Sequence, residues 1–291
     1  MLLRSMLFVP SYNVKFLESS LTKKADALIF DLEDSVPEEF RPKAREILKT
    51  FLDREELKGK KIFIRLNPIE SNMLEEDLKV SMHENVTGFM LSKIYTAKDM
   101  EYYEDLISNK ENDLGFDEEK FVFLPLIETT AAVLDVYNIA MSSKRIVGLA
   151  FGGEDYLNDL HGKHGEPPIT FNYPRAKIAL AARAAGVLPI DTPYLDLHDD
   201  DGFINEESAS FEMGFAGCLL IHPSQIELAN KTFVPTEEEV KESQEIFDAI
   251  KAAEKNGSGV AMLNGKMIGP PMRKRAEKVL SLMELIEKES Q

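Results

Sequence analysis

The sequence contains no tryptophan and only one cysteine, Cys218, in 291 residues. A single cysteine cannot form an intramolecular disulfide, and because Cys218 lies in the apolar run of residues 217–221 we expect it to be a buried strand residue. Basic residues are also scarce, since 34 Lys and Arg stand against 51 Asp and Glu and give a formal net charge of -17. This charge argues against nucleic acid or an anionic membrane surface as a partner. A site for an anionic substrate must therefore contain its own Arg or Lys.

Long apolar runs are missing as well. No segment reaches the roughly 18 apolar residues of a membrane helix, and the amino terminus MLLRSMLFVP is too short and wrongly ordered for a signal peptide. We therefore expect a cytoplasmic protein. Two nucleotide-binding signatures are also absent, because no GxGxxG follows the first predicted strand and GxxxxGKS/T occurs nowhere.

What is present is an alternation of short apolar segments with helical stretches, in a chain with 44% apolar residues. Eight segments read as strands, and eight strands with intervening helices are typical of a (β/α)₈ TIM barrel of the α/β class. We favour this fold over an open doubly wound sheet. The predicted strands are residues 5–9, 27–31, 61–66, 88–91, 121–127, 146–151, 187–190 and 217–221.

The predicted helices include residues 37–52, 173–185 and 236–255, and Glu237, Glu238 and Glu239 indicate a solvated helix start. Residues 260–286 add a strand-like or loop piece and a last helix, which have no place in the eightfold pattern. We predict that residues 1–235 form the barrel and that residues 236–291 form a small C-terminal helical extension that covers a rim as a lid.

Polar residues follow each predicted strand, where a barrel of this kind has its active site. In chain order these positions are Pro10-Ser11, Asp31 to Asp34, Arg65 to Pro68, Ser92-Lys93, Glu128-Thr129, Gly152 to Asp155, Asp191-Thr192 and His222-Pro223. Ordinary solvated loops would also be polar, but they would not so regularly place acids and bases directly after the apolar run.

Residues 121–156 read as a strand ending at Glu128, a helix, and a second strand ending at Glu154 and Asp155. Parallel strands joined by a helical crossover place these carboxylates side by side at one end of the sheet. Carboxylates together with water and substrate are the ligands that Mg²⁺ prefers. The alternative is that Glu128 caps the following helix and that Gly152-Gly153 is an ordinary turn.

Seven motifs in order resemble the citrate lyase beta subunit and its relatives, the malyl-CoA and citramalyl-CoA lyases of the HpcH/HpaI aldolase/citrate lyase family. They are RSMLFVP, FDLEDSV, IRLNP, IETT, GGEDY, IHPSQI and LNGKMIGPP, and they extend from Arg4 to about Leu280. The resemblance implies a barrel with a C-terminal lid, Mg²⁺, and cleavage of a 3-hydroxyacyl thioester into an acyl thioester and a 2-oxo acid.

By position, the resemblance assigns Glu128 and Asp155 to the metal. Arg65 matches the arginine that holds the substrate carboxylate and the developing oxyanion, a role that suits a guanidinium because it stays charged and bonds bidentately. The alternative for Arg65 is a surface ion pair. Three further residues, Asp31, Glu33 and Asp34, match acids that orient Arg65 and the waters at the metal.

Further binding positions are also implied. Glu128, Gly153 and Glu154 are assigned to the substrate together with Arg65, and the glycine region would contribute backbone amides. Lys15 and Phe16 fall where the family contacts coenzyme A, and Arg4 and Lys93 are similar cases. A lysine on a helix face is, however, more often simply solvated.

One position departs from the family pattern. The lid motif of such lyases ends in an aspartate, thought to exchange the proton on the acyl carbon, where this sequence has Gly269. A glycine cannot carry a proton, so another acid would have to substitute, or bound water, or the activity is reduced or altered. The candidate acids are Asp199, Asp200 and Asp201.

We therefore predict a Mg²⁺-dependent carbon–carbon lyase acting on citryl-CoA or a citryl-acyl-carrier thioester and releasing a 2-oxo acid such as oxaloacetate. One alternative is a malyl-CoA or citramalyl-CoA lyase, or a retuned aldolase without the lid acid. Another is a non-catalytic subunit that binds metal and oxo acid within a larger, citrate lyase-type complex. The resemblance also suggests a homotrimer or hexamer, because the lid serves a neighbour's site.

Overall fold

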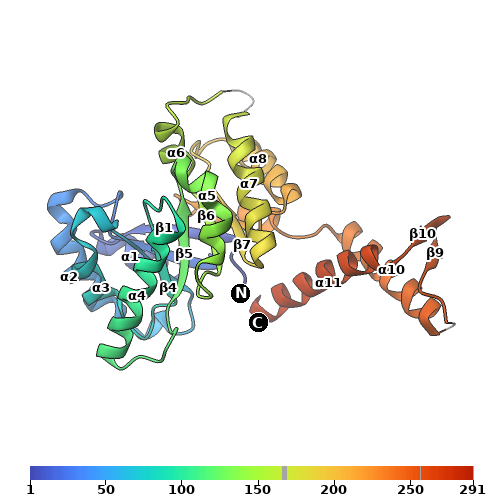
Figure 1. Ribbon diagram of the computed structural model, residues 1–291, viewed down its shortest axis with the longest axis horizontal. Helices are drawn as coiled ribbons and strands as arrows, with labels where there is room; N and C mark the ends of the chain where they lie inside the picture. Colours follow the sequence, from blue (N-terminus) through green and yellow to red (C-terminus); the bar gives the residue numbers. More distant parts are fainter. Residues whose placement is uncertain (166–168, 256, 291) are drawn as a thin grey trace. The chain divides into compact units, whose positions relative to one another are not determined.

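The computed structural model describes residues 1–165, 169–255 and 257–290, and the chain divides into two compact units (Figure 1). One unit is Leu3–Thr232, and the other is Phe233–Gln291 together with Met1–Leu2.

The larger unit is a closed barrel of eight parallel strands, each paired with its neighbours in the chain and β1 paired with β8. Its strands are β1 (Ser5–Pro10), β2 (Ala27–Asp31), β3 (Ile62–Leu66), β4 (Gly88–Leu91), β5 (Val122–Ile127), β6 (Gly148–Phe151), β7 (Leu188–Asp191) and β8 (Gly217–Leu220). The predicted barrel is confirmed. The largest boundary error is at β6, because Ile146 makes only an isolated bridge to Phe123 before regular pairing begins.

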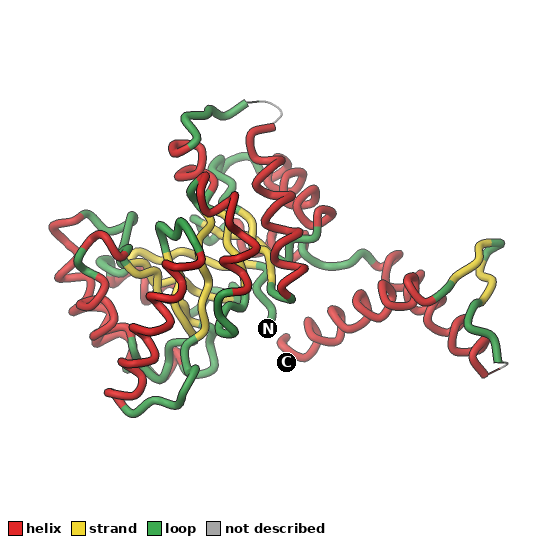
Figure 2. Tube along the Cα trace, in the orientation of Figure 1, coloured by secondary structure: helices red, strands yellow, loops and turns green. Residues whose placement is uncertain are grey.

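Helices surround these strands, as the red and yellow segments of Figure 2 show. They are α1 (Val14–Ser20), α2 (Arg41–Leu52), α3 (Leu74–Ser81), α4 (Ala97–Leu114), α5 (Thr130–Met141), α6 (Gly153–Asp159), α7 (Ile169–Ala185), α8 (Asp200–Met213) and α9 (Gln225–Thr232), with short 3-10 turns at Glu38–Phe40, Glu55–Leu57 and Ile69–Ser71. The predicted start of α7 at residue 173 is wrong by four residues, since the helix begins at Ile169 and contains Pro174.

The barrel interior is filled by buried side chains from alternating strand positions, as expected for strands whose residues alternate between faces. This core includes Met6, Ile29, Phe63, Met90 and Leu124. Cys218 is fully buried in β8, as predicted. The strand ends are thereby held in a rigid ring.

The smaller unit contains α10 (Glu237–Lys255), the antiparallel strands β9 (Ala261–Leu263) and β10 (Lys266–Ile268), and α11 (Pro270–Ser290). Its core is Ile246, Ile250, Ile268 and Ala276. Asn264 and Gly265 both have positive φ angles, of 49° and 75°, which matches the Asn-Gly turn that closes two-residue hairpins. Across the described parts of both units, we find no helix that is long and apolar enough to cross a membrane.

A buried arginine braces the amino-terminal end of the barrel. Arg145, just before β6, bonds both carboxylate oxygens of Glu111 at 2.7 Å and reaches Glu104 Oε1 with its Nε at 2.6 Å. Both glutamates belong to α4, so this cluster fixes a helix to the amino-terminal end of the barrel, opposite the carboxyl-terminal strand ends.

Replacing Arg145 with Met is expected to destabilise the protein by about 3–5 kcal/mol, because Glu111 would remain buried without a counter-charge. Urea unfolding followed by circular dichroism measures this loss. The control is Arg54→Met, whose pairs with Glu18 and Glu56 are exposed and add little to stability. Equal stability of the two variants would show that the Arg145 cluster does not brace the fold.

Candidate active site

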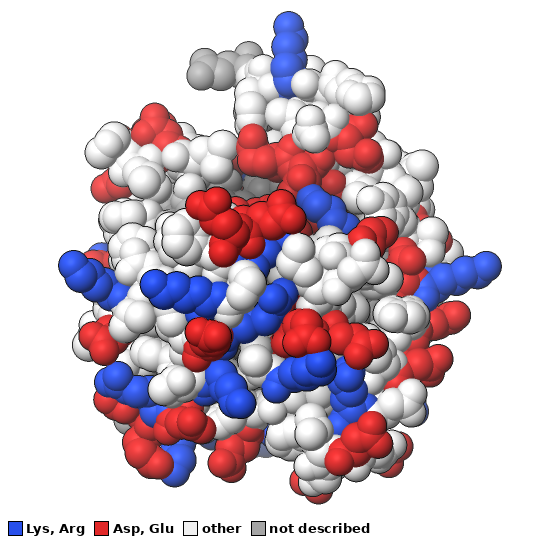
Figure 3. Space-filling model, turned by 90° about the vertical axis from the view of Figure 1, so that its left-hand side faces the viewer, with Lys and Arg blue, Asp and Glu red and all other residues white. Residues whose placement is uncertain are grey.

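The strands bring the predicted acids and bases together at their carboxyl-terminal ends. Asp31 and Arg65 are register partners at the ends of β2 and β3, and Lys93 and Glu128 follow β4 and β5. Asp155 lies in the first turn of α6, directly after β6. On the face shown in Figure 3, acidic side chains gather around a hollow and basic side chains lie beside them.

Arg65 is buried and held rigidly. Its Nε and Nη2 atoms bond the two carboxylate oxygens of Asp31 at 2.8 and 2.6 Å, and its guanidinium lies over the ring of Phe8 at 4.7 Å. Burial opposes the charge of both partners, but their mutual attraction is stronger, so the pKa of Asp31 is lowered and that of Arg65 is raised. Arg65 therefore stays charged, and the alternative of a surface ion pair is wrong.

The other two predicted acids differ in exposure. Glu33 is buried and lies 3.1 Å from Arg65 Nη1, whereas Asp34 is half exposed and lies 3.5 Å from the same atom. Burial raises the pKa of Glu33 to about 7, although the charge of Arg65 opposes the shift. Glu33 can therefore change its protonation state near neutral pH.

Glu128 is only 1% exposed. Its Oε1 accepts a hydrogen bond of 2.7 Å from the backbone N–H of Lys93, while Oε2 has no hydrogen-bond partner among the described residues. Burial raises the pKa of Glu128 to about 8. The residue that caps α5 is Thr129, whose side chain accepts from the Ala132 N–H. The alternative reading of Glu128 as a helix cap is therefore wrong.

Lys93 joins the two predicted metal carboxylates. Its Nζ lies 2.7 Å from Asp155 Oδ1 and 3.5 Å from Glu128 Oε1, and its backbone is left-handed, with a φ of 50°. Burial by itself lowers the pKa of the Lys93 ammonium, but the charge of Glu128, the hydrogen bond and charge of Asp155 and the charge of Glu33 together outweigh burial, so the pKa is raised. The sequence identified Lys93 only as a coenzyme A contact.

These residues fit a hard divalent cation. Both carboxylates approach the side-chain nitrogen of Lys93, and Glu128 Oε2 is a buried acceptor without a partner among the residues that the structure describes. Within the described residues no group of three or more acidic, His or Cys side chains has the arrangement of a metal site. Mg²⁺ does not require one, because it is commonly bound by one or two carboxylates with water and substrate.

The two glycines before Asp155 are needed for close packing. A Cβ on Gly152 would lie 2.6 Å from the Cβ of Glu128, and one on Gly153 would lie 2.6 Å from Thr192 Oγ1. The Gly153 N–H already donates to Thr192 Oγ1 at 2.9 Å. The predicted use of the Gly153 amide for substrate therefore has to be corrected, because that amide bonds to Thr192.

The remaining predicted residues have different surroundings. Glu154 is exposed and pairs with His164 at 3.0 Å. Lys15 and Phe16 are exposed in the first turn of α1, where Phe16 lines an apolar cavity of about 320 Å³ with Phe8. Arg4 precedes β1 and is held by both oxygens of Asp26 at 2.9 Å, so it lies at the opposite end of the barrel.

The candidate replacement acids have ordinary positions at the start of α8. Asp199 caps this helix by accepting from the Gly202 N–H, and it also accepts from the Tyr194 hydroxyl at 2.7 Å. Asp200 and Asp201 lie in the exposed first turn. The capping bonds of Asp199 disfavour it as a proton carrier.

Fold and site together define an α/β barrel protein that presents paired carboxylates and a buried, charged arginine at the carboxyl ends of its strands. Residues 4–223 match the family HpcH/HpaI aldolase/citrate lyase, and the chain belongs to this family.

Individual relatives extend the match over nearly the whole chain. The chain is 35% identical over 277 residues to citrate lyase subunit beta of Haemophilus influenzae, covering 95% of both proteins. It is 28% identical over 289 residues to the mitochondrial citramalyl-CoA lyase of Rattus norvegicus, covering 96% of this chain and 85% of that protein. The resemblance read from the motifs is confirmed, and the chain falls among the lyases of its family.

A solved structure is also similar. CitE from Mycobacterium tuberculosis, in complex with magnesium, acetoacetate and coenzyme A, has a TM-score of 0.76 and 25% sequence identity, covering 95% of this chain and 96% of that one.

Proposed function

We propose that the protein is a Mg²⁺-dependent carbon–carbon lyase that cleaves a 3-hydroxyacyl thioester of the citryl-CoA or citryl-acyl-carrier type. The products are an acyl thioester and a 2-oxo acid such as oxaloacetate. The observation that carries this proposal is the convergence of Glu128 and Asp155 on one cationic nitrogen, beside an Arg65 locked by Asp31. The magnesium, acetoacetate and coenzyme A bound by the mycobacterial relative support it.

Cleavage requires that the substrate hydroxyl lose a proton and that the thioester fragment accept the bonding electrons as an enolate. The enolate carbon then takes up a proton from bound water or another acid, since Gly269 cannot supply one. Glu128 and Asp155 would hold Mg²⁺, which when bound supplies Lewis-acid stabilisation to substrate oxygens. Arg65 holds the substrate carboxylate and opposes the developing negative charge. Glu33, with a pKa of about 7, is suited to accept the hydroxyl proton near neutral pH.

The thioester arm has a matching apolar surface. The cavity beside Phe16 is also lined by Leu7 and Phe8 of β1 and by Ile221, which directly follows β8. This cavity would bind the uncharged part of the thioester carrier, and Lys15, next to Phe16, would pair with the carrier's anionic groups. Coenzyme A and the prosthetic group of an acyl-carrier protein share this chemistry, so the proposal includes thioesters of both.

The lid position is open to an acid. Gly269 precedes α11, and its carbonyl accepts the first helical bonds from Met272 and Arg273 at 3.0 and 3.1 Å. Among the described residues, a Cβ there would meet Val260 Cγ1 alone, at 3.7 Å, and aspartate is favoured at such a helix start. The glycine is therefore not required by the fold. The alternatives to the citryl type are a malyl-CoA or citramalyl-CoA lyase, or a retuned aldolase without the lid acid. A homotrimer or hexamer remains part of the proposal.

A coupled assay for 2-oxo acid release tests the proposal, with citryl-CoA, malyl-CoA and citramalyl-CoA, with Mg²⁺ or chelator. Expected is Mg²⁺-dependent release by the wild type, lost in Asp155→Ala and unchanged or increased in the equally folded Gly269→Asp. If the wild type is inert and Gly269→Asp is active, the natural reaction is a different one. Mg²⁺ binding without any turnover by either protein would favour a non-catalytic subunit of a complex.

A further inference from the structure

A chain of buried contacts leads from α7 to the first turn of α6. Arg175 Nε lies 3.0 and 2.9 Å from the two carboxylate oxygens of Asp191, at the end of β7. Asp191 Oδ1 in turn accepts a hydrogen bond of 2.8 Å from the Thr192 N–H. The Thr192 hydroxyl oxygen, in a residue only 4% exposed, accepts the Gly153 N–H at 2.9 Å. The far end of this chain is thus two residues from Asp155.

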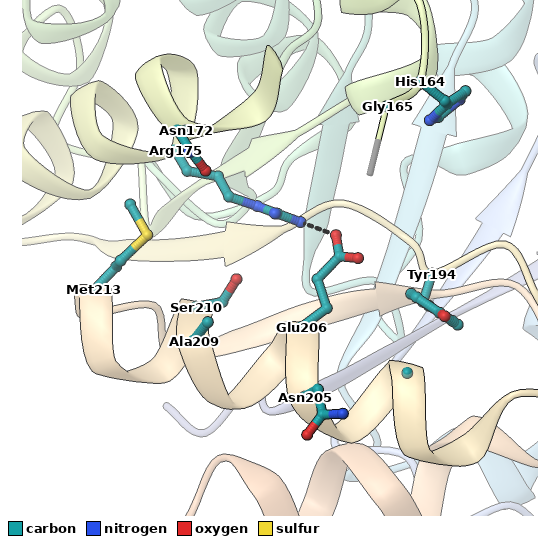
Figure 4. A pocket seen from close by; sticks show the side chains of 11 residues that line it. His164, Gly165, Asn172, Arg175, Tyr194, Asn205, Glu206, Ala209, Ser210 and Met213 are labelled. Carbon is teal, nitrogen blue, oxygen red and sulfur yellow. Dashed lines mark hydrogen bonds and ion pairs between the residues drawn. The ribbon is translucent and has the colours of Figure 1, made fainter. Parts of the chain in front are cut away.

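Asp191 and Arg175, at the other end of this series of contacts, are also held by neighbouring side chains. Figure 4 shows Arg175 reaching from α7 toward Glu206 of α8, across the wall of a cavity of about 770 Å³. Ser210, also in α8, donates its hydroxyl to Asp191. Asp191 is therefore held from two helices, and its position determines that of Thr192.

The start of α6 is gripped on two sides. Gly152 packs against Glu128 of the β5 end, and Gly153 packs against Thr192 of the β7 end, each so closely that a Cβ would lie 2.6 Å away. At its other end, α6 is held by Asp159, which accepts from the Thr130 N–H at 2.7 Å. The position of Asp155 relative to Glu128 is therefore set by these contacts of the α6 backbone as well as by the ion pairs that both carboxylates make with Lys93.

We propose that Thr192, fixed by Asp191 and Arg175, is a positioning residue that aims Asp155 at the cation site. This inference rests on the proposed function, since it concerns the same Mg²⁺ site. The hydroxyl is the essential group, because only an acceptor at this point orients the first amide of α6. Residues that orient metal ligands in this way typically change metal affinity about 10–100-fold when replaced.

The test is a calorimetric Mg²⁺ titration of the full-length wild type, Thr192→Val and Thr192→Ser. Valine keeps the shape but removes the acceptor, so we expect about tenfold weaker Mg²⁺ binding, whereas serine keeps the oxygen and should bind as the wild type does. The matched control is Thr87→Val. Thr87 Oγ1 accepts the Ile62 N–H at 3.0 Å at the opposite end of the barrel, so its loss should lower stability without changing Mg²⁺ affinity.

Wild-type Mg²⁺ affinity in Thr192→Val would overturn the inference, as would equal weakening in Thr87→Val or no Mg²⁺ binding by the wild type. The proposed lyase activity can fail separately. If the wild type binds Mg²⁺ but releases no 2-oxo acid, the proposed thioester reaction is wrong. The titrations of the Thr192 variants still decide whether Thr192 affects Mg²⁺ binding.

Discussion

Replacing Arg65 with Lys is expected to lower kcat/KM for 2-oxo acid release by about 100–1,000-fold, the usual cost of removing a donor aimed at developing charge. Lysine keeps the positive charge but cannot bond both oxygens of Asp31 and reach Glu33 at once. The ammonium would be drawn to Asp31 and away from the substrate carboxylate. Mg²⁺ affinity should change little, because Arg65 pairs with neither Glu128 nor Asp155 in this structure.

The matched control for this change is Arg145→Lys. Arg145 is as deeply buried and bonds Glu111 through two nitrogens, but it lies at the amino-terminal end of the barrel. Both variants should lose stability, and only Arg65→Lys should lose turnover per folded molecule. Steady-state kinetics on protein checked by circular dichroism measures the difference. Full activity in Arg65→Lys would remove Arg65 from the reaction.

Much of the candidate site is predictable from the sequence, because the residues that follow parallel strands all lie at the carboxyl-terminal end of the barrel. Asp31, Arg65 and Glu128 each follow or end an apolar run, so their meeting requires only that the barrel close. For the proposed metal ligands one further inference is needed, namely that a helical crossover places Glu128 and Asp155 at the same end of the sheet. Arg4 was misplaced because it precedes its strand instead of following it.

Other features depend on geometry that spacing does not encode. Lys93 reaches the two carboxylates from a left-handed backbone, with a φ of 50°, which a non-glycine residue adopts only when its surroundings require it. Thr192 was seen as a polar strand end, but its bond to Gly153 depends on how closely β6 and β7 approach. For the same reason, the sequence alone predicts free amides at Gly152 and Gly153, although the Gly153 amide is bonded to Thr192.

Replacing Glu128 with Gln should separate function from stability, because the two effects have opposite signs. Glu128 has a pKa of about 8 in the folded protein against 4.5 as a free group, because of burial. The neutral form is therefore favoured by folding. The contribution of the neutral Glu128 side chain to the free energy of unfolding is fully present below about pH 4.5 and is lost as the pH rises through about 8. Glutamine stays neutral and can still accept the Lys93 N–H, so the metal-free variant should be more stable than the wild type at alkaline pH.

Mg²⁺ binding should respond in the other direction. In the wild type a proton on Glu128 competes with the cation, so the apparent affinity should rise roughly tenfold per pH unit below about pH 8 and level off above it. Glu128→Gln should bind Mg²⁺ at least about 100-fold more weakly, lose this pH dependence, and lose Mg²⁺-dependent turnover, because it removes an anionic ligand. Calorimetric titrations and urea unfolding between about pH 6 and about pH 9 measure both effects.

The matched control for Glu128→Gln is Glu111→Gln. Glu111 is also a buried glutamate, but it is paired bidentately with Arg145, so its neutral replacement should destabilise the protein and leave Mg²⁺ binding intact. Neutralising a carboxylate that stabilises the fold lowers the free energy of unfolding. Neutralising a buried carboxylate that serves to bind a cation raises the free energy of unfolding of the metal-free protein. If Glu128→Gln instead loses stability as Glu111→Gln does and still binds Mg²⁺ normally, Glu128 belongs to the structural class and the metal site must be sought elsewhere.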